Sequence, residues 1–450
     1  MEVELKESHI FNNRDLMALI FPLMVEQFLA VAVGLADSIM VASVGESAVS
    51  AVSLVDSVII LLINIFAALA TGGAVVAGQY IGQQRLEKAS ESGDQLLVFV
   101  TFISVIIMAL MYIGRGFILN VVFGNIDVDV ANYAETYLLI VFSSIPFIAL
   151  YSSGAALFRA MGNSKITMFV SFIMNAINVI GNVILIYGLH MGVEGAAIPT
   201  LVSRVVAALL IVGFLKNESI LIHISKPFKY RYDKKMVRDI LRIGIPNGVE
   251  NSMFQLGKIL LLSIVAGFGT ASITANAVGN TIASFEILPG AAVGLGLITV
   301  VSRCVGAGDY EMARYYTKKL LKYTYISVII LNIGTILVLP YVLEIYNLSS
   351  ETAAMAKQVI IFHSVNTCII WPLSFTLPNT LRASNDVRYT MIVGVGSMWI
   401  FRIGFGILLA KYMGFGMFGV WVAMIIDWIA RTIFFTIRYK GRRWETKTKI

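Results

Sequence analysis

The chain has 450 residues, of which 58% are hydrophobic and only 14% are charged. Soluble domains usually carry about 25% charged residues, so the composition excludes an ordinary water-soluble globular protein. The formal net charge of +7 raises the question of nucleic acid as a partner, and the distribution of the charge along the chain answers it below. We predict an all-α membrane protein.

Apolar runs recur from Leu16 almost to the end of the chain, each near or above the roughly 20 residues that cross a bilayer as a helix. The first run is long and lacks a small-residue cleavage site, so we expect it to stay as a helix and not to be removed as a signal peptide. We predict twelve spans, at about 16–42, 48–78, 94–114, 131–156, 165–190, 194–215, 240–267, 272–302, 320–343, 355–380, 389–412 and 416–437.

Lysine and arginine are concentrated in alternate loops. The rich set includes the N-terminus, 226–242, 303–322 and the tail from Arg438, whereas the poor set offers only Arg115, Lys357 and Lys411. Cytoplasmic loops of membrane proteins carry the excess of these residues. We therefore expect a multi-pass protein of the cell membrane with both termini in the cytoplasm, and no nucleic acid as a partner.

The sequence repeats itself at an offset of 224 residues. The segment 14–89 aligns without a gap with 238–313, and 17 of the 76 positions are identical. Each half holds an even number of spans, so the repeat is predicted to be parallel, with a cleft between two lobes. We predict an N-terminal six-helix lobe at 1–215, a cytoplasmic linker at 216–239, a C-terminal six-helix lobe at 240–437 and a basic tail at 438–450. Identical pairs include Arg14/Arg238, Pro22/Pro246, Glu26/Glu250 and Gly82/Gly306.

Several segments carry a family resemblance. They are PLMVEQFLAVAVGLADSIMVASVG (22–45), GQYIGQQRLEKA (78–89), LFRAMGNS (157–164), GVEGAA (192–197), SRCVGAGDYEMA (302–313), LRASND (381–386) and DWIARTIFF (427–435). In order and spacing they resemble the multidrug and toxic compound extrusion (MATE) transporters over essentially the whole chain, nearest the DinF-like branch. The resemblance implies a V-shaped antiporter that exports cationic, amphipathic drugs or metabolites in exchange for H⁺ or Na⁺. We expect a monomer among membrane lipids, without a cofactor.

Asp37 is the leading candidate for cation coupling. Ionisable groups inside a span are costly and are therefore functional candidates. The resemblance puts Asp37 where the family keeps a first-helix carboxylate implicated in coupling, and the second half has Leu261 at the matched position. Burial raises the pKa of a carboxyl group, which allows proton exchange near neutral pH. The alternative is a static acid held by neighbouring polar groups.

Polar residues at helical spacing form a stripe on the fifth span. Ser171, Asn175, Asn178 and Asn182 are four, three and four residues apart, so they share one face. We assign Asn178 and Asn182 to the coupling site with Asp37, and Asn175 to the cavity. Asn182 stands where some family members have aspartate. Amides that join neighbouring helices are the alternative.

The first half holds further candidates. Pro22 lacks an amide hydrogen and can kink its helix, which the resemblance implies bends when the acid is protonated; its match in the repeat leaves a structural role open. Glu26, which shares a helix face with Asp37, and Arg204 lie at similar depth, so we expect a buried pair. Asp56 is assigned to the cavity.

The second half holds Glu250, Lys258 and Glu286 inside its spans, and all three are assigned to the cavity or to a second coupling site. Lys258 and Glu286 have no charged counterpart in the first half, so either they pair with each other or one of them couples a cation. Near the end of the chain, comparable depth and helical spacing predict an ion-pair network of Arg402, Asp427 and Arg431.

Trp371 bears on the choice of ion. The sodium-coupled branch of the family uses an acid in the tenth span, and spacing from LRASND places Trp371 there. This favours H⁺, although oxygen ligands from Asp, Asn and Ser leave Na⁺ open. Trp371 is also a candidate wall of the substrate cavity.

Two rival functions remain. A lipid-linked saccharide flippase would need a cationic cavity, for which Arg204, Lys258 and Arg402 are available. A membrane enzyme is disfavoured because no catalytic motif is present and the four histidines are scattered. Cys304 and Cys368 show no ligand spacing, so no metal site is assigned.

Overall fold

The computed structural model describes residues 10–124, 126–224 and 231–446, and within these ranges the regular elements are helical. Parts of the predicted linker 216–239 and of the basic tail 438–450 lie outside the described residues. Ten of the described helices are long and apolar enough to span a membrane, and the number is twelve when each of two bent helix pairs counts as one span. The predicted all-helical membrane fold is confirmed.

Contacts divide the chain into two compact units, Met17–Gly248 and Val249–Ile450 with Met1–Leu16. This differs from the predicted boundaries at 215 and 240, because the helix that begins the second half starts in one unit and ends in the other. The first helix likewise changes units after Leu16.

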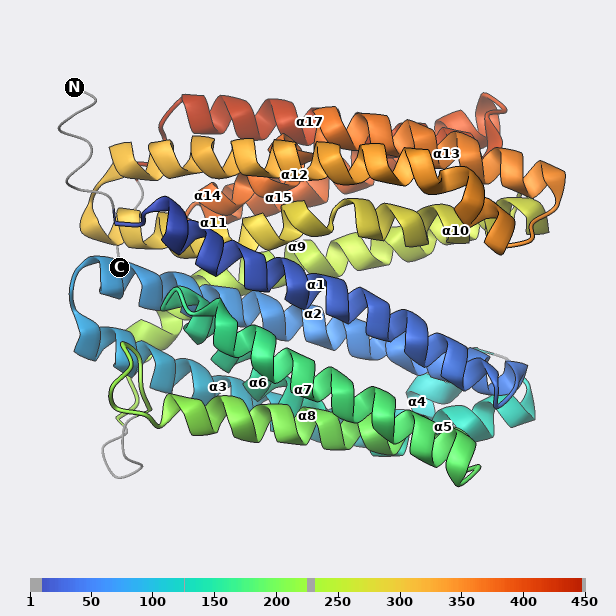
Figure 1. The fold of residues 1–450 in the computed structure, drawn as a ribbon, viewed down its shortest axis with the longest axis horizontal. Coiled ribbons are helices and arrows are strands. Elements are labelled where there is room, and N and C mark those ends of the chain that lie inside the picture. Colours follow the sequence, from blue (N-terminus) through green and yellow to red (C-terminus); the bar gives the residue numbers. More distant parts are fainter. Residues whose placement is uncertain (1–9, 125, 225–230, 447–450) are drawn as a thin grey trace. The chain divides into compact units, whose positions relative to one another are not determined.

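In the unit Met17–Gly248, α2 packs against α3 and α6, and α7 packs against α8 (Figure 1). The α5–α6 pair is one span bent by 49°. The helices are α1 (Asn13–Ala42), α2 (Glu46–Gly82), α3 (Leu86–Ile113), α4 (Arg115–Phe117), η2 (Ile118–Val122), α5 (Val128–Phe142), α6 (Ile145–Ala160), α7 (Ser164–Asn182), η3 (Val183–Gly188) and α8 (Glu194–Leu215).

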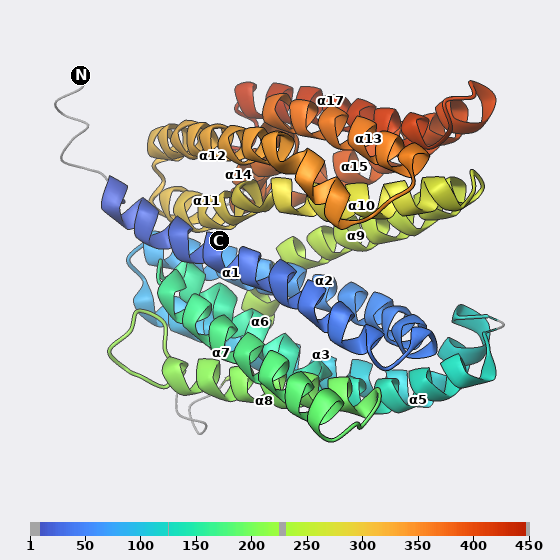
Figure 2. The ribbon, with the colours of Figure 1, turned by 45° about the vertical axis from the view of Figure 1, so that its right-hand side comes forward.

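In the other unit, α11 packs against α12, and α10 packs against α13 (Figure 2). A bend of 63° breaks the predicted tenth span after Ile369. The helices are α9 (Lys234–Ala266), α10 (Thr270–Glu286), α11 (Leu288–Ala307), α12 (Tyr310–Ile345), α13 (Ser350–Ile369), η5 (Pro372–Thr376), α14 (Pro378–Ala383), α15 (Val387–Ser397), η6 (Met398–Gly404), α16 (Phe405–Ile407), η7 (Leu408–Tyr412) and α17 (Gly416–Lys440).

The second span of each half shows how the repeats have diverged. In the first half it is the continuous helix α2, whereas in the second half it is divided between α10 and α11. Pro289 follows the division and has no amide hydrogen to continue the helical bonding. Glu286 is the last residue of α10, so a buried acid stands at the break.

Candidate functional site

Asp37 on α1 and the polar stripe of α7 meet, as the sequence predicted. The Asn182 Nδ2 donates a hydrogen bond of 2.7 Å to the Asp37 Oδ1. With its amide turned to suit both neighbours, Asn178 donates to Asp37 Oδ1 and Oδ2 at 2.8 and 3.1 Å and accepts from the Thr200 hydroxyl at 3.1 Å. Three residues assigned to coupling thus share one set of hydrogen bonds.

The rest of the stripe continues along the same helix. Asn175, one turn before Asn178, donates from its Nδ2 to Ser171 Oγ at 3.4 Å. Asn182 is almost fully buried, and its Oδ1 has no hydrogen-bond partner. A buried acceptor without a donor is costly, so this oxygen is available to accept a hydrogen bond.

Asp56 and Arg204 extend the charged group. The Tyr137 hydroxyl donates to Asp56 Oδ1 at 3.2 Å, and Arg204 Nη1 donates to Ser144 Oγ at 2.7 Å. The charges of Asp37, Asp56 and Arg204 interact with one another. When both acids are ionised, the three side chains carry one negative charge in excess, which a single cation can balance. Sequence reasoning gave no role to Tyr137.

Pro22 lies inside α1 and removes the amide hydrogen that would bond to the Ala18 carbonyl. Ser164, the first residue of α7, replaces that donor: its hydroxyl donates to the Ala18 and Leu19 carbonyls at 3.3 and 2.5 Å. Such side-chain donors allow proline inside membrane helices. The proline on the helix of Asp37 is therefore tied to the helix that carries the stripe.

The expected pair between Glu26 and Arg204 is wrong. Glu26 is buried, accepts a hydrogen bond of 3.0 Å from the Thr167 hydroxyl and lies 3.7 Å from Arg159 Nη1. Similar depth in the membrane does not fix the direction of a side chain, and the two residues point into different neighbourhoods. The Glu26 pairing with an arginine of the LFRAMGNS segment is a scaffold feature.

The second half repeats that scaffold. Glu250, the match of Glu26, pairs with Arg382 of the LRASND segment at 2.8 Å. The predicted network is confirmed: Asp427 lies 2.9 Å from Arg431 Nε and 3.7 Å from Arg402 Nη1. Arg431 also lies 4.0 Å from Glu250, which links the two groups.

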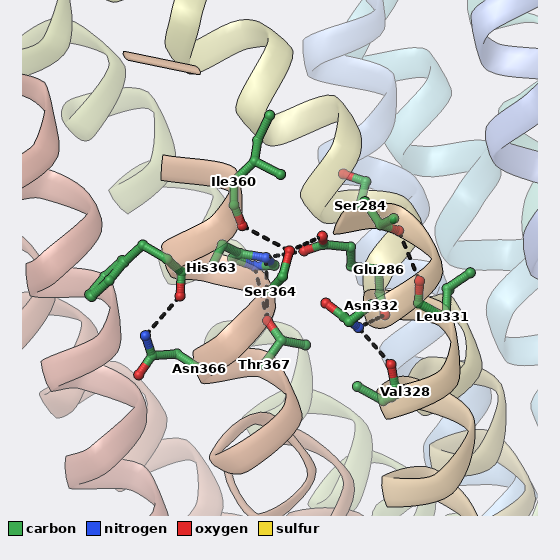
Figure 3. Close-up of polar contacts among 12 residues, drawn as sticks. Ser284, Glu286, Val328, Leu331, Asn332, Ile360, His363, Ser364, Asn366 and Thr367 are labelled. Atoms are coloured by element: carbon green, nitrogen blue, oxygen red, sulfur yellow. Dashed lines mark hydrogen bonds and ion pairs between the residues drawn. The ribbon is translucent and has the colours of Figure 1, made fainter. Parts of the chain in front are cut away.

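Of the two alternatives for Lys258 and Glu286, a mutual pair is not what the structure shows, because Glu286 binds other side chains. Glu286 is fully buried and faces α13, where His363 Nδ1 lies 2.5 Å from its Oε2 and the Ser364 hydroxyl donates to its Oε1 (Figure 3). Asn332 of α12 donates to the Glu286 backbone carbonyl at 3.2 Å. The sequence signal that was missed is a lone histidine in an apolar span, next to a serine, opposite an unmatched acid.

Lys258 and Trp371 have separate surroundings. The Lys258 ammonium lies 5.0 Å from the centre of the Phe254 ring. Trp371 is buried, stacks on Phe375 at 5.3 Å and covers Gly290, where a Cβ would lie 2.1 Å from its ring. It is part of a hydrophobic core cluster in its unit. Among the described residues, no three His, Cys, Asp or Glu side chains form a group able to hold a metal ion.

Among the described residues, ten to twelve apolar spans in two repeated halves, with polar and charged side chains inside them, make this a multi-pass helical membrane protein of the kind typical of transporters. The MatE family profile matches the chain twice, at residues 22–184 and 246–408, which is more than half of its length and reproduces the offset of 224. The chain belongs to the MatE family, which confirms the resemblance seen in the sequence.

Relatives match over nearly the full length. An uncharacterized transporter, YisQ of Bacillus subtilis, is 26% identical over 441 residues, covering 96% of this chain and 95% of the relative. A probable multidrug resistance protein NorM of Thermotoga maritima is 24% identical and covers 97% and 94%. A solved outward-facing multidrug resistance MATE family transporter of the MOP superfamily has a TM-score of 0.88 at 19% identity, covering 96% of each chain. The fold is thus that of MATE transporters.

Proposed function

We propose that this protein is a proton-coupled antiporter that exports cationic or amphipathic compounds by alternating access. The observation that carries the proposal is the Asp37 carboxylate, held by the buried amides of Asn178 and Asn182 in a group with one negative charge in excess. One proton or one organic cation balances that charge. Because the two compete for one acid, binding of the first releases the second, which is the requirement for exchange.

The surroundings of Asp37 suit both protonation states. The ionised carboxylate accepts from the Asn182 Nδ2. A protonated carboxyl group gains a donor, and the unpartnered Asn182 Oδ1 can accept from it once the amide turns. The cost of each state in a water-poor site is therefore limited, and a proton can be taken up and given back.

Pro22 provides a way for protonation of Asp37 to change the shape of α1. It weakens α1 about four helical turns before Asp37. The donor that compensates for it belongs to α7, which also holds the Asp37 carboxylate through Asn182. A change in the Asp37 hydrogen bonds shifts α1 against α7, and the helix bends most easily where its own bonding is interrupted. We assign the bend of the transport cycle to Pro22.

The proposal includes placement in the cell membrane as a monomer with both termini in the cytoplasm. It is supported by the concentration of Lys and Arg in alternate loops, which is the usual mark of cytoplasmic loops. Reaction of single cysteines, placed at Lys440 and at Lys411, with a membrane-impermeant reagent tests it. Labelling of the Lys440 position in intact cells would contradict the orientation.

The test of function is efflux of a fluorescent organic cation from vesicles under an imposed pH gradient or, separately, an imposed Na⁺ gradient. We expect export driven by the pH gradient, its loss in Asp37→Asn, and wild-type export in the control Asp129→Asn, which removes an exposed acid of the same unit. Wild-type export in Asp37→Asn would refute the role of Asp37. Export that follows only the Na⁺ gradient would replace H⁺ with Na⁺.

A further inference from the structure

An open cavity of about 300 Å³ lies within the unit that contains residues 249–450. This is the lower end of the range of about 300–1,000 Å³ typical of small-molecule sites. The side chains that line it come from α9, α10, η6 and α17, and no acid is among them. They are Lys258, Leu261, Leu262, Val265, Asn276, Asn280, Ser284, Arg402, Val420, Trp421 and Met424.

This cavity occupies the place in the second half that the Asp37 group occupies in the first. At the offset of 224, Leu261 corresponds to Asp37, and Asn280 corresponds to Asp56. Both acids are therefore replaced by neutral residues. In addition, Lys258 stands where the first half has Gly34, so a positive charge is gained.

Arg402 adds a second positive charge at a matched position. The buried positions Asn178, Asn182 and Ile186 of the first half correspond at the same offset to Arg402, Gly406 and Ala410, which are also buried. The corresponding stretch of the second half is π-helical, in η6. Such segments insert a residue into a helix and occur often at functional sites. Arg402 thus stands at the position that corresponds to Asn178, whose amide binds Asp37 in the first half.

Arg402 is more than nine-tenths buried, and two of its donors, Nε and Nη1, have no hydrogen-bond partner. Asp427 does not supply a hydrogen bond: its Oδ2 forms an ion pair with Arg402 Nη1 at 3.7 Å, which is beyond hydrogen-bond distance and leaves this oxygen without a hydrogen-bond partner as well. Its Oδ1 is bound by Arg431 Nε at 2.9 Å and by the Ser397 hydroxyl. Buried donors without acceptors are costly, and an ion that accepts from them recovers that cost.

The surrounding charges do not balance. Glu250 and Asp427 supply two negative charges to Arg382, Arg402 and Arg431. With Lys258, two positive charges are therefore in excess among the described side chains of this cluster. The Lys258 Nζ and the Arg402 Cζ lie 5.0 and 5.1 Å from the centre of the Phe254 ring, which is a weak partner for both cations. Glu286, bound to His363, can offset at most one of the two charges.

The other side chains that line the cavity indicate the chemical character of the rest of a bound anion. Leu261, Val265, Val420 and Met424 are apolar, and Trp421 presents an aromatic surface. The Trp421 Nε1 donates to Asn276 Oδ1 at 3.1 Å, which turns the amide nitrogen of Asn276 toward other acceptors. The cavity therefore offers fixed donors and cations next to an apolar surface.

We propose that this cavity binds an amphiphilic oxyanion, with its phosphate or carboxylate group on Arg402 and Lys258 and its apolar part against Trp421 and the aliphatic side chains. The inference goes beyond the proposed function, because it needs neither a proton gradient nor Asp37. It gives the two halves sites of opposite charge preference.

Equilibrium binding to the purified full-length protein tests the proposal. The probes are octyl phosphate, octanol and octylammonium, which share the chain and differ in charge. We expect octyl phosphate to bind saturably, and about tenfold more tightly than either of the others, because a hydrogen bond to a charged group contributes about 1.5–3 kcal/mol. Equal binding of the three probes would overturn the proposal.

Variants locate the site. Lys258→Gln and Arg402→Gln are each expected to weaken octyl phosphate binding about tenfold or more. Lys318→Gln, which removes an exposed cation of α12 outside the cavity, should leave it unchanged. Lys258 is exposed, so its variant is expected to fold, and wild-type affinity in that variant would refute the assignment.

Lipid nanodiscs distinguish the two sources of the anion. If a phospholipid head group is the occupant, phosphatidylglycerol in the disc should weaken octyl phosphate binding relative to phosphatidylcholine, and Lys258→Gln should abolish the difference. If a free amphiphile is the occupant, affinity should be the same in both discs. Either result supports an anion site, whereas competition that persists unchanged in Lys258→Gln places the anion elsewhere.

Discussion

Substitution of Gly72 by alanine tests a close approach of two helix backbones in the unit Met17–Gly248. Gly72 lies in α2, and a Cβ at this position would stand 2.5 Å from the Ile240 carbonyl oxygen and 3.0 Å from the Gly244 nitrogen of α9. Both are backbone atoms, so no side-chain rotation relieves the clash. A normal contact of about 3.5 Å requires the helices to separate by about 1 Å. A Cβ at Gly244 of α9 would in turn lie 3.0 Å from the Leu69 Cα of α2, so glycine is needed on both helices at this contact.

Overpacking of this kind costs about 1–3 kcal/mol. At about 2–4 °C per kcal/mol for a unit of this size, the apparent melting temperature of Gly72→Ala should fall by about 2–12 °C. The assay is thermal unfolding in detergent. Gly334→Ala in α12 is the matched control, because a Cβ there meets open space and alanine favours a helix by about 1 kcal/mol. If Gly72→Ala melts no lower than Gly334→Ala, the two helices are not in backbone contact.

Two other substitutions probe buried polar contacts by thermal unfolding. Ser164→Ala should destabilise the protein by about 1–2 kcal/mol, because the carbonyl freed by Pro22 loses its donor. The cost should be smaller in a Pro22→Ala background. Strictly additive effects of the two substitutions would contradict the compensation of Pro22 by Ser164. His363→Leu should cost about 3–5 kcal/mol, because the buried Glu286 carboxylate keeps only the Ser364 hydroxyl and loses its ion-pair partner. Glu286→Leu together with His363→Leu should recover much of the loss; a double variant as unstable as the single would contradict the pairing.

The spans and the repeat were predictable because both leave linear signals. Hydropathy over about 20 residues marks each span, and an ungapped offset reveals the duplication. The breaks were harder to see. Pro289 and Pro372 are visible in the sequence, but proline inside α1 and α8 interrupts neither helix. In α1 the Ser164 hydroxyl supplies a replacement donor. Whether a proline breaks a span depends on contacts that the sequence does not show.

The site was predictable where residues share a helix face. Asn178 and Asn182 follow from helical spacing, and their meeting with Asp37 follows from the family resemblance. Partners across helices did not follow, because depth in the membrane leaves the rotation of each helix open. Glu26 therefore pairs with Arg159 and not with Arg204. His363 was missed because its meaning depends on Glu286, which lies 77 residues away.

The helix α9 begins in one compact unit and ends in the other, and α1 also changes units, at Leu16. The sequence repeat and the compact units therefore have different boundaries. A protein cut at the repeat boundary would separate the start of α9 from α2, the helix whose Gly72 it approaches through Ile240 and Gly244.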